Sequence, residues 1–569
     1  KARLMGNDAR VVVRRSDVPP GPDGPLDPAL PPWPRLIARD PGLWQESLER
    51  ARTGPKVLIA NNVPGFYNST ILESILAVAL TLRGAQVHVL LCDEVLPACL
   101  KLKVGKSGPD RVAEGTFRKQ VCRDCVAMGS AFALQGVPVH RYSQLLSPEE
   151  RAAAGRLARS TPAGDIPGFK MGGMAIGEHA YAGCLRYYST GSLEGQHRPD
   201  EVLARYFEAA ILTGKVMEKL AAAHDYGAAC FHHGIYIPQG VVSEACRQKG
   251  IRVVTWNVAY RKRCFIFSHG DTYHHTLLDE PVSEWKDIPY TDAHDEEIRR
   301  YLRSRWNGSQ DWIYFHDTPD DRLDTLTEET GIDLQKPIIG LLTNVMWDAQ
   351  LHYRANAFPS MLDWILKTIQ HFAGRRELQL LIRGHPAEIR GLQKSRQLVM
   401  DEIRKRYPRL PENVFVISPG SNINTYAAMS RCNSVIIYGT KTGVELASMG
   451  IPVIVAGEAW IRNKGLTLDA SSEEEYCSIL RKLPFAEARL PEEKAREARK
   501  YAYHFFLRRM IPLACIEPVE GAVPYRLGVS SLQDLLPGVD EGLDVVCNGV
   551  LDGNSFVFRS EDRPPGAMS

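Results

Sequence analysis

The hydrophobic positions of this chain form two successive series of short apolar runs that alternate with amphipathic segments. In the first series, apolar runs at 56–61, 86–92 and 137–142 alternate with amphipathic segments at 69–84 and 125–134. Short apolar runs are typical of buried strands, and a 3.6-residue periodicity indicates helices. The alternation predicts parallel strands joined by crossover helices, and their carboxyl ends are expected to face a ligand-binding cleft.

A second series follows a polar, acidic stretch at 317–334, which lacks apolar periodicity and contains Pro319. Its predicted strands are 338–343, 378–382, 414–417, 435–438 and 452–456, and its predicted helices are 359–372 and 392–407. Two such series in one chain predict an α/β protein with two domains.

The predicted divisions follow from these patterns and from proline content. They are a proline-rich N-terminal arm at 1–54, a first domain at 55–330, a second domain at 331–495 and a C-terminal extension at 496–569. Prolines concentrate at 18–34, which indicates extended or disordered chain rather than core. A chain of 569 residues is also too long for a single hydrophobic core.

Composition excludes several classes of function. Apolar residues make up 44% of the chain, charged residues make up 24%, and the net charge is +2, so there is no general electrostatic reason to expect nucleic acid. The most apolar stretch, 71–82, contains Glu73 and is shorter than the roughly 20 residues of a membrane span. The charged residues at 1–17 argue against a secretory signal. We expect a cytoplasmic protein, with peripheral association at the inner membrane left open.

Four of the twelve cysteines show a spacing that suggests a metal site. Cys92, Cys99, Cys122 and Cys125 are spaced C-x6-C-x22-C-x2-C. Four thiolates could hold a structural zinc ion, and the C-x2-C half is a common chelating unit. The first pair has an unusual spacing, and cysteines at strand ends are often simply buried. Structural zinc and buried thiols therefore remain alternatives.

The stretch after the apolar run 435–438 has the character of an anion-binding loop. Gly439-Thr-Lys-Thr-Gly443 leads into a predicted helix, with Glu445 in its first turn. Thr440, Lys441 and Thr442 offer hydroxyl groups and a cation, and the helix end offers free N–H groups. Glu445 could stabilise the helix end or accept hydrogen bonds from sugar hydroxyls. An ordinary strand-to-helix turn capped by threonine is the alternative.

A second loop with phosphate-binding chemistry follows the strand at 378–382. It reads Arg383-Gly-His385-Pro386-Ala-Glu388. An arginine can bind phosphate through two parallel hydrogen bonds, a histidine can donate one, and proline fixes the loop. The alternative is a turn whose histidine caps a neighbouring element. Asn344 ends the strand at 338–343 and is expected at the same edge.

Three strand ends in the first domain bring polar side chains together in the prediction. The apolar run 228–231 leads into His233, the run 252–256 leads into Asn257, and the run 265–267 leads into His269 and Asp271. An imidazole at such an edge could act as the general base that deprotonates an acceptor hydroxyl. We name His233 as the candidate, with His269 and Asp271 as rivals. A single histidine at a strand end is more often structural, so that alternative stays open.

The loops of the second half resemble a known family. Gly439-Thr-Lys-Thr-Gly-Val-Glu-Leu-Ala447, Gly450-Ile-Pro-Val-Ile454, Gly457-Glu-Ala-Trp460 and Gly465-Leu-Thr467 resemble the nucleotide-binding half of capsule polysaccharide biosynthesis proteins. These belong to the two-domain (GT-B) glycosyltransferases, and some transfer Kdo from a CMP donor. The resemblance implies two Rossmann-like domains facing a cleft and a C-terminal helix that crosses back to the first domain.

The resemblance also implies the function and the binding residues. The family carries a His-Pro element in its second domain, matched here by His385-Pro386. The expected reaction moves a sugar from a nucleotide-sugar donor to a carbohydrate or glycolipid acceptor of the bacterial surface. No cofactor is expected, because the chain lacks the Asp-x-Asp element of metal-dependent glycosyltransferases. The residues expected to bind nucleotide or phosphate are Asn344, Arg383, His385, Pro386, Glu388, Thr440, Lys441, Thr442, Gly443 and Glu445.

Three other functions remain open. A sugar-nucleotide 2-epimerase shares the architecture and would act without an acceptor. A phosphotransferase of the teichoic-acid type would use a CDP-alcohol donor. A non-catalytic protein of polysaccharide assembly or export would keep the fold without turnover.

Overall fold

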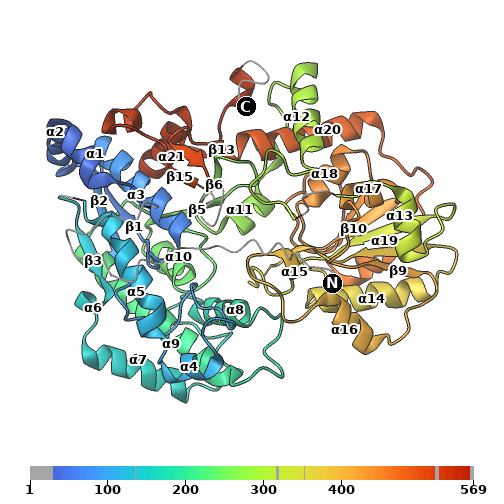
Figure 1. Cartoon of the computed structure of the whole chain (residues 1–569), viewed down its shortest axis with the longest axis horizontal. Coiled ribbons are helices and arrows are strands. Elements are labelled where there is room, and N and C mark those ends of the chain that lie inside the picture. Colours follow the sequence, from blue (N-terminus) through green and yellow to red (C-terminus); the bar gives the residue numbers. More distant parts are fainter. Residues whose placement is uncertain (1–29, 135, 316–318, 352, 520–524, 564–569) are drawn as a thin grey trace, which may run out of the picture.

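The computed structural model describes residues 30–563, except 135, 316–318, 352 and 520–524. Two α/β domains lie side by side, the first on the left and the second on the right of Figure 1. Each is built on one sheet, and the sheets contain seven and six strands. The predicted fold of two Rossmann-like domains is confirmed.

The seven-stranded sheet of the first domain has the order β13-β6-β5-β4-β1-β2-β3. Strands β1 to β5 are parallel, as their apolar runs and crossover helices predict. The strands are β1 (Lys56–Ile59), β2 (Gln86–Leu91), β3 (Val139–Arg141), β4 (Ala228–His232), β5 (Arg252–Val258), β6 (Cys264–His269) and β13 (Ile511–Pro512).

Helices cover both faces of this sheet. Those grouped with α9 cover one face: α4 (Pro109–Glu114), α6 (Tyr142–Leu145), α7 (Pro148–Ser160), α8 (Ile176–Tyr188), α9 (Pro199–Ala223) and α10 (Gln239–Gln248). The other face carries α1 (Trp33–Arg39), α2 (Pro41–Ala51), α3 (Tyr67–Leu82) with α5 (Arg118–Gly129) beside it, and α21 (Glu541–Asp552). The hairpin of β14 (Ile516–Pro518) and β15 (Tyr525–Leu527) packs near α3.

The predicted N-terminal arm is wrong for residues 33–51, which form α1 and α2. Proline stands in the first turn of both helices, where it is tolerated because its missing N–H would be unpaired anyway. Trp33 and Trp44 are buried against α3, and the Trp33 indole donates a hydrogen bond of 2.9 Å to Ser74. The proline-rich residues 18–29 lie outside the described residues.

Strand β6 runs antiparallel to β5, which corrects the predicted convergence of three strand ends. Val254 pairs with His269 and Val258 pairs with Phe265. The connection at 259–263 is too short for a crossover, which parallel pairing would require. The carboxyl end of β6 therefore lies toward the amino end of β5. Residues that follow β6 begin at the edge of the sheet opposite the cleft.

The six-stranded sheet of the second domain is wholly parallel, in the order β12-β11-β10-β7-β8-β9. Its strands are β7 (Ile338–Leu342), β8 (Gln379–Arg383), β9 (Val414–Ile417), β10 (Ser434–Ile437), β11 (Val453–Val455) and β12 (Leu468–Asp469). Its helices include α14 (Met361–Ala373), α15 (Ala387–Arg390), α16 (Val399–Arg406), α17 (Thr425–Ser430), α18 (Thr442–Ser448) and α19 (Glu473–Arg481).

The stretch predicted as a domain boundary contains a helix of the second domain. Helix α13 (Leu323–Thr330) packs against β9 and α17, with Leu326 fully buried. It is preceded by α11 (Tyr273–Asp279) and α12 (Asp292–Ser304). Only Leu326 is buried within α13, which explains why its apolar periodicity is too weak to see in the sequence.

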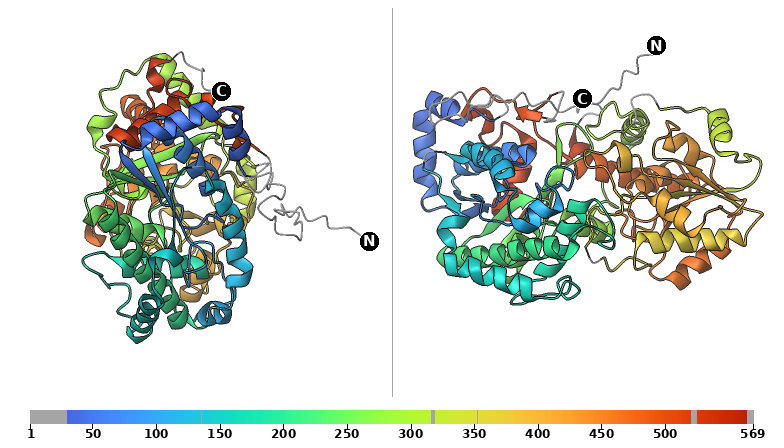
Figure 2. Two further views of the ribbon diagram at one scale, coloured as in Figure 1. Left: turned by 90° about the vertical axis from the view of Figure 1, so that its left-hand side faces the viewer. Right: turned by 60° about the horizontal axis from the view of Figure 1, so that its bottom comes forward.

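The C-terminal segment links the domains, as the resemblance implies. Helix α20 (Glu492–Tyr503) packs against α18 of the second domain and against α12. The chain then enters the first sheet as β13, which pairs antiparallel with β6. Figure 1 shows α20 and β13 along the upper side of the molecule, and the red segment lies between the two domains in the right-hand view of Figure 2. The predicted crossing is confirmed, because this segment contacts both domains.

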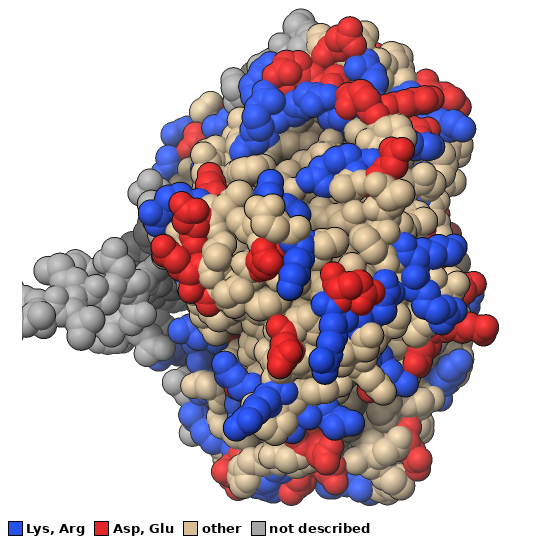
Figure 3. Space-filling view, turned by 90° about the vertical axis from the view of Figure 1, so that its right-hand side faces the viewer, with Lys and Arg blue, Asp and Glu red and all other residues tan. Residues whose placement is uncertain are grey.

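The surface of the second domain is electrically mixed. Figure 3 shows basic and acidic side chains interspersed over the described part of the outer face of this domain, with no extended region of one sign. In the described part of the chain, no helix has both the length and the apolar character needed to cross a membrane.

A buried carboxyl group on α3 gives the first testable prediction. Glu73 is fully buried and accepts hydrogen bonds from the Trp256 indole, at 2.9 Å, and from the Asn61 amide. Burial raises its pKa to about 8, although these hydrogen bonds oppose the shift. The native protein therefore binds a proton that the unfolded chain releases near pH 4.5. The stabilisation is fully present below pH 4.5 and is lost as the pH rises to about 8.

We expect the thermal stability of the wild-type protein, relative to a Glu73→Gln variant, to fall between pH 5 and pH 8. Glutamine does not titrate, so the variant lacks this contribution to the pH dependence. Thermal unfolding followed by circular dichroism at several pH values measures it. Parallel curves for the two proteins would contradict the assignment.

Candidate active site

A cavity of about 510 Å³ lies between the carboxyl edges of the two sheets. This volume lies within the range of typical small-molecule sites. First-domain residues on its wall include His233, Asn257, Tyr260, Tyr273 and His274. Second-domain residues include Thr343, Asn344, Asp348, Arg383, His385, Pro386, Tyr426, Thr440, Lys441, Thr442 and Glu458. The structure thus brings together most of the predicted binding residues.

The predicted anion-binding loop lies on the cavity wall. Thr440, Lys441 and Thr442 all face the cavity. The Thr440 hydroxyl accepts a hydrogen bond of 3.3 Å from the Thr442 backbone N–H, which fixes the turn. Helix α18 has only seven residues, so affinity for an anion rests on these side chains more than on the helix end. Gly443 packs behind the loop, where a β-carbon would lie only 2.5 Å from the Ile437 Cδ1 atom.

Lys441 is held in place by a buried network of charges. Its ammonium group lies 3.1 Å from Glu445 and 4.8 Å from the centre of the Tyr260 ring. Glu445 also pairs with Arg305, which in turn pairs with Asp311. The Tyr426 hydroxyl donates a further hydrogen bond of 2.9 Å to Glu445. The network ties the second-domain loop to the segment that joins the domains.

The network defines the role of Glu445. Its side chain is 3% exposed, and it does not belong to the cavity wall. Burial acts to raise its pKa, but the charges of Arg305 and Lys441 outweigh burial and lower it. Glu445 is therefore ionised and engaged by protein groups, so it positions Lys441 rather than contacting a sugar hydroxyl. Burial, with the charge of Arg305, lowers the pKa of Lys441 to about 8.

His385 presents a defined hydrogen-bond donor to the cavity. Its Nδ1 accepts the backbone N–H of Ala387 at 3.1 Å, so the neutral ring carries its proton on Nε2. Burial, together with the charges of Arg383 and Lys441, lowers the pKa of His385 to about 4, so the ring is neutral at pH 7. Its backbone N–H donates to the Thr343 hydroxyl at 3.0 Å, and Pro386 follows on the cavity wall. His385 can thus donate Nε2–H to a phosphate oxygen.

Two other residues of this loop serve the structure of the domain. The Arg383 guanidinium donates to the carbonyl oxygens of Ser418 and Ser421, and burial lowers its pKa to about 10. The predicted bidentate phosphate contact would require these bonds to break. Glu388 is fully buried and accepts the backbone N–H of Val399 at 2.9 Å. Burial raises its pKa to about 7, and it lies outside the cavity wall.

Asn344 connects the two predicted loops. Its side-chain oxygen accepts the backbone N–H of Gly439 at 3.2 Å, which joins the end of β7 to the turn after β10. Both residues line the cavity. Asn344 therefore orders the loop that carries Thr440 and Lys441.

The first domain contributes one of its three predicted residues to the site. His233 lines the cavity in a left-handed backbone conformation (φ 67°), and its buried Nδ1 has no hydrogen-bond partner among the residues that the structure describes. Burial, with the charges of His232 and His274, lowers its pKa well below the usual value. The Nε2–H of His269 instead donates a hydrogen bond of 2.9 Å to the backbone carbonyl oxygen of Asn554, and the His269 ring stacks on Phe556. Asp271 pairs with Arg247 and His275.

The placement of His269 and Asp271 corrects their candidacy as base. Neither belongs to the cavity wall. The reason is the antiparallel direction of β6, which carries His269 away from the cleft edge. The chain then turns back through α11, so His274 rather than His269 reaches the cavity.

The cavity also contains a carboxyl group that is not among the predicted binding residues. Glu458 follows β11, lines the cavity, and has an Oε2 atom with no hydrogen-bond partner among the described residues. Burial raises its pKa to about 7. A carboxyl group in a cleft with a pKa near neutrality is a candidate acid or base. The sequence feature that could have indicated Glu458 is its position directly after a predicted buried strand, in Gly457-Glu-Ala-Trp460.

Two aromatic rings and one contact across the cleft complete the site. Trp306 and Tyr426 stack with their ring centroids 5.8 Å apart and their planes 11° apart, and both line the cavity. Across the cleft, the Tyr236 hydroxyl of the first domain donates to Asp348 of the second at 2.6 Å. This hydrogen bond is a direct link between the two domains.

The four predicted zinc ligands lie in the first domain, away from this cavity. Burial raises the pKa of Cys92 to about 12, and nearby Cys122 and Cys125 add to the shift. Burial likewise raises the pKa of Cys99 and Cys125. Over the described residues, no three of these sulfur atoms lie within 4.8 Å of one another. Zinc binding would require the side chains to move together, and the zinc site stays a prediction.

Comparison with protein families identifies the second domain. Residues 314–490 match the profile of the capsule polysaccharide biosynthesis protein family. The match spans the loops on which the resemblance was based, so the predicted family is confirmed for this domain. No curated protein shows significant sequence similarity to the chain.

Several solved structures align with the chain at low sequence identity. A beta-Kdo 2,4-transferase, KpsC of Thermosulfurimonas dismutans, aligns with 13% identity over 48% of this chain and 79% of its own, with a TM-score of 0.31. The UDP-GlcNAc 2-epimerase of Neisseria meningitidis aligns with 11% identity over 79% and 98%, with a TM-score of 0.27. MurG of Acinetobacter baumannii aligns with 14% identity over 79% and 95%, with a TM-score of 0.25. The fold assignment rests on the strand order of the two sheets.

Proposed function

We propose that this chain, whose second domain has the sequence profile of the capsule polysaccharide biosynthesis family, is a GT-B glycosyltransferase. It transfers a sugar from a nucleotide-sugar donor to a carbohydrate or glycolipid acceptor. One observation carries the proposal: His385 and Lys441 of the second domain share a cavity with His233 of the first. Nucleotide sugars are cytoplasmic metabolites, so the proposal places the reaction in the cytoplasm, with a glycolipid acceptor presented at a membrane surface.

The donor phosphate would bind at the loops after β8 and β10. His385 offers its Nε2–H, Lys441 offers a positive charge, and Thr440 and Thr442 offer hydroxyl groups. These groups are preorganised by Glu445 and Thr343, so they need little rearrangement as negative charge develops on the leaving nucleotide. The stacked pair Trp306 and Tyr426 offers an aromatic surface for the base.

Lys441 supplies the positive charge at the leaving group that a divalent ion supplies in metal-dependent transferases. The proposal therefore includes transfer that needs no metal ion at the donor phosphate. Turnover should persist after treatment with a chelator, and a return of activity only when Mg²⁺ or Mn²⁺ is added back would overturn this part.

Glu458 is the proposed general base for the acceptor hydroxyl. A base works best when its pKa lies close to the working pH, and the pKa of Glu458 is raised to about 7. The pKa of His233 is lowered well below that of free histidine, so its neutral ring is a weaker base. His233 is then better suited to hydrogen bonding with the acceptor.

We expect a Glu458→Gln variant to lose about 10²- to 10⁴-fold in kcat/KM. In the wild-type protein, kcat/KM should rise with pH through an inflection near pH 7, because the base must be ionised, and this limb should vanish in the variant. Initial rates across pH 5–9 measure both effects.

Glu474→Gln is the matched control, since Glu474 is exposed on α19 and outside the cavity. A Glu458→Gln variant that keeps both wild-type turnover and the inflection would contradict the assignment.

A further inference from the structure

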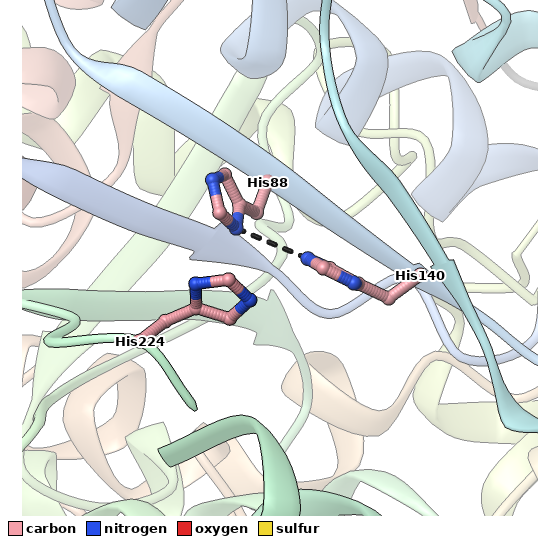
Figure 4. Close-up of side chains that lie close together, drawn as sticks. All are labelled: His88, His140 and His224. Atoms are coloured by element: carbon pink, nitrogen blue, oxygen red, sulfur yellow. Dashed lines mark hydrogen bonds between the residues drawn. The ribbon is translucent and has the colours of Figure 1, made fainter. Parts of the chain in front are cut away.

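Three histidines meet in the first domain, outside the cleft. His88 lies on β2, His140 lies on β3, and His224 follows the last turn of α9. One ring nitrogen from each histidine lies within 4.8 Å of a ring nitrogen of each of the other two. No other three potential metal ligands lie this close together in the described part of the chain. Figure 4 shows the three rings facing one another from three different elements. The ring centroids are 4.7 to 5.1 Å apart.

Strand register and helix position produce this arrangement. His140 pairs with Leu90, and His88 lies two residues before Leu90 on the neighbouring strand. Side chains two residues apart point to the same face of a sheet, so both imidazoles project toward the face covered by α9. His224 is the C-cap residue of that helix. The meeting of the three rings therefore follows from the pairing of two strands and the position of a helix end.

The hydrogen bonding inside the cluster is crowded. His88 Nδ1 lies 3.0 Å from His140 Nε2 and 2.9 Å from the Tyr226 hydroxyl. A ring nitrogen carries either one hydrogen or one lone pair. It therefore cannot form full hydrogen bonds to both of these partners, whether it donates or accepts. Two imidazole nitrogens about 3.0 Å apart are close to the roughly 3.3 Å separation that two Zn–N bonds of about 2.0 Å impose in a tetrahedral site.

We propose that His88, His140 and His224 bind one divalent transition-metal ion of the zinc class, each through one ring nitrogen. Imidazole ligands suit zinc, cobalt, nickel and copper, whereas magnesium and calcium require oxygen ligands. None of the three ligands is a carboxylate. Burial, with the charges of His140, His224 and Lys56, lowers the pKa of His88 to about 4, and burial with the charge of Lys56 lowers the pKa of His224. Binding thus depends on coordination chemistry rather than on negative charge. A fourth position remains for water or for the Tyr226 hydroxyl.

The proposed ion would be structural. None of the three histidines lines the cavity between the domains. The ion would instead join β3, a three-residue strand at the edge of the sheet, to β2 and to the end of α9. A ligand that binds only the folded state stabilises it by mass action. Bound metal is therefore expected to raise the unfolding temperature without changing the turnover number.

The test uses the full chain after removal of metal by a chelator. Zinc is titrated by calorimetry, and cobalt binding is followed by absorption spectroscopy, which separates nitrogen ligands from thiolates. The variants are His140→Gln and His224→Gln, both at partly exposed positions. His197→Gln is the control, because His197 is an exposed histidine of the same domain that pairs with Asp110.

We expect one zinc ion to bind to the wild-type and control proteins, with a rise in unfolding temperature. Either cluster variant should weaken binding by more than the roughly 10- to 100-fold typical of outer-shell changes. The cobalt spectrum should lack thiolate charge-transfer bands. Circular dichroism checks that each variant folds, and two variants on different elements keep the test decisive if one fails. No binding, binding unchanged in a folded cluster variant, or a thiolate spectrum that assigns the ion to the cysteines would overturn the proposal.

Discussion

A His385→Ala variant is expected to lose about 10²- to 10³-fold in kcat while its unfolding temperature changes little. The Nε2–H of His385 is positioned for the charge that develops on the leaving phosphate, because the Ala387 N–H occupies its Nδ1. Alanine removes this donor and leaves the loop held by the bond from the His385 backbone N–H to Thr343. Steady-state rates with the donor at saturation give kcat.

His371→Ala provides the control for this experiment. His371 lies on α14 of the same domain, is half-buried, and does not line the cavity. We expect it to leave kcat unchanged. Unchanged turnover in His385→Ala would remove His385 from the mechanism, and a large fall in unfolding temperature would assign it a structural role instead.

A Glu445→Ala variant is expected to be destabilised by about 3–5 kcal/mol, because it removes one partner of a buried ion pair. Arg305 and Lys441 would lose their shared carboxylate in a region where both are almost fully enclosed. For a domain of this size, the loss corresponds to a fall of about 10 °C in unfolding temperature. Nucleotide affinity should fall as well, since Lys441 would no longer be held on the cavity wall.

Glu412→Ala is the matched control, because Glu412 is exposed in the same domain. Glu445→Gln keeps the shape and the hydrogen bond from Tyr426 but not the charge, and an intermediate loss is expected. A Glu445→Ala variant that is as stable as the control would mean that Asp311 alone suffices to neutralise Arg305.

Local sequence patterns predicted the second domain well. Its strands are short, wholly apolar and followed by polar loops, so the apolar runs at 378–382 and 435–438 correspond closely to β8 and β10. All strands of this sheet are parallel, so strand ends could be assigned to one edge without knowing the strand order. This is why Thr440, Lys441 and His385 could be placed together from the sequence.

The errors arose where tertiary contacts decide the structure. An apolar run predicts a strand but not its direction, so the antiparallel β6 was not foreseen, and His269 was placed at the wrong edge. Trp33 and Trp44 gain their burial from α3, far away in the sequence. Prolines near them favour extended chain in a sequence-based prediction. Proline is also common in the first turn of a helix, and that is its position here.

Residues of the site itself were mispredicted for a related reason. Glu445 and Arg383 have the right chemistry for a ligand, but the structure pairs Glu445 with Arg305 and Arg383 with backbone carbonyls. The sequence shows which chemical groups a side chain could bind. It does not show which of these groups the fold places next to it. The raised pKa of Glu458 likewise depends on burial, which no local pattern reveals.

The central claim is that the second domain binds a nucleotide through His385 and Lys441. The most direct test is calorimetric titration of CMP, CDP, UDP and GDP into the wild-type protein and into His385→Ala. We expect one nucleotide to bind clearly more tightly than the others, and its affinity to fall in the variant; preference for CMP would favour a Kdo-like donor. No binding of any of the four, or binding that the variant leaves unchanged, would contradict the claim and favour a role in polysaccharide assembly without turnover.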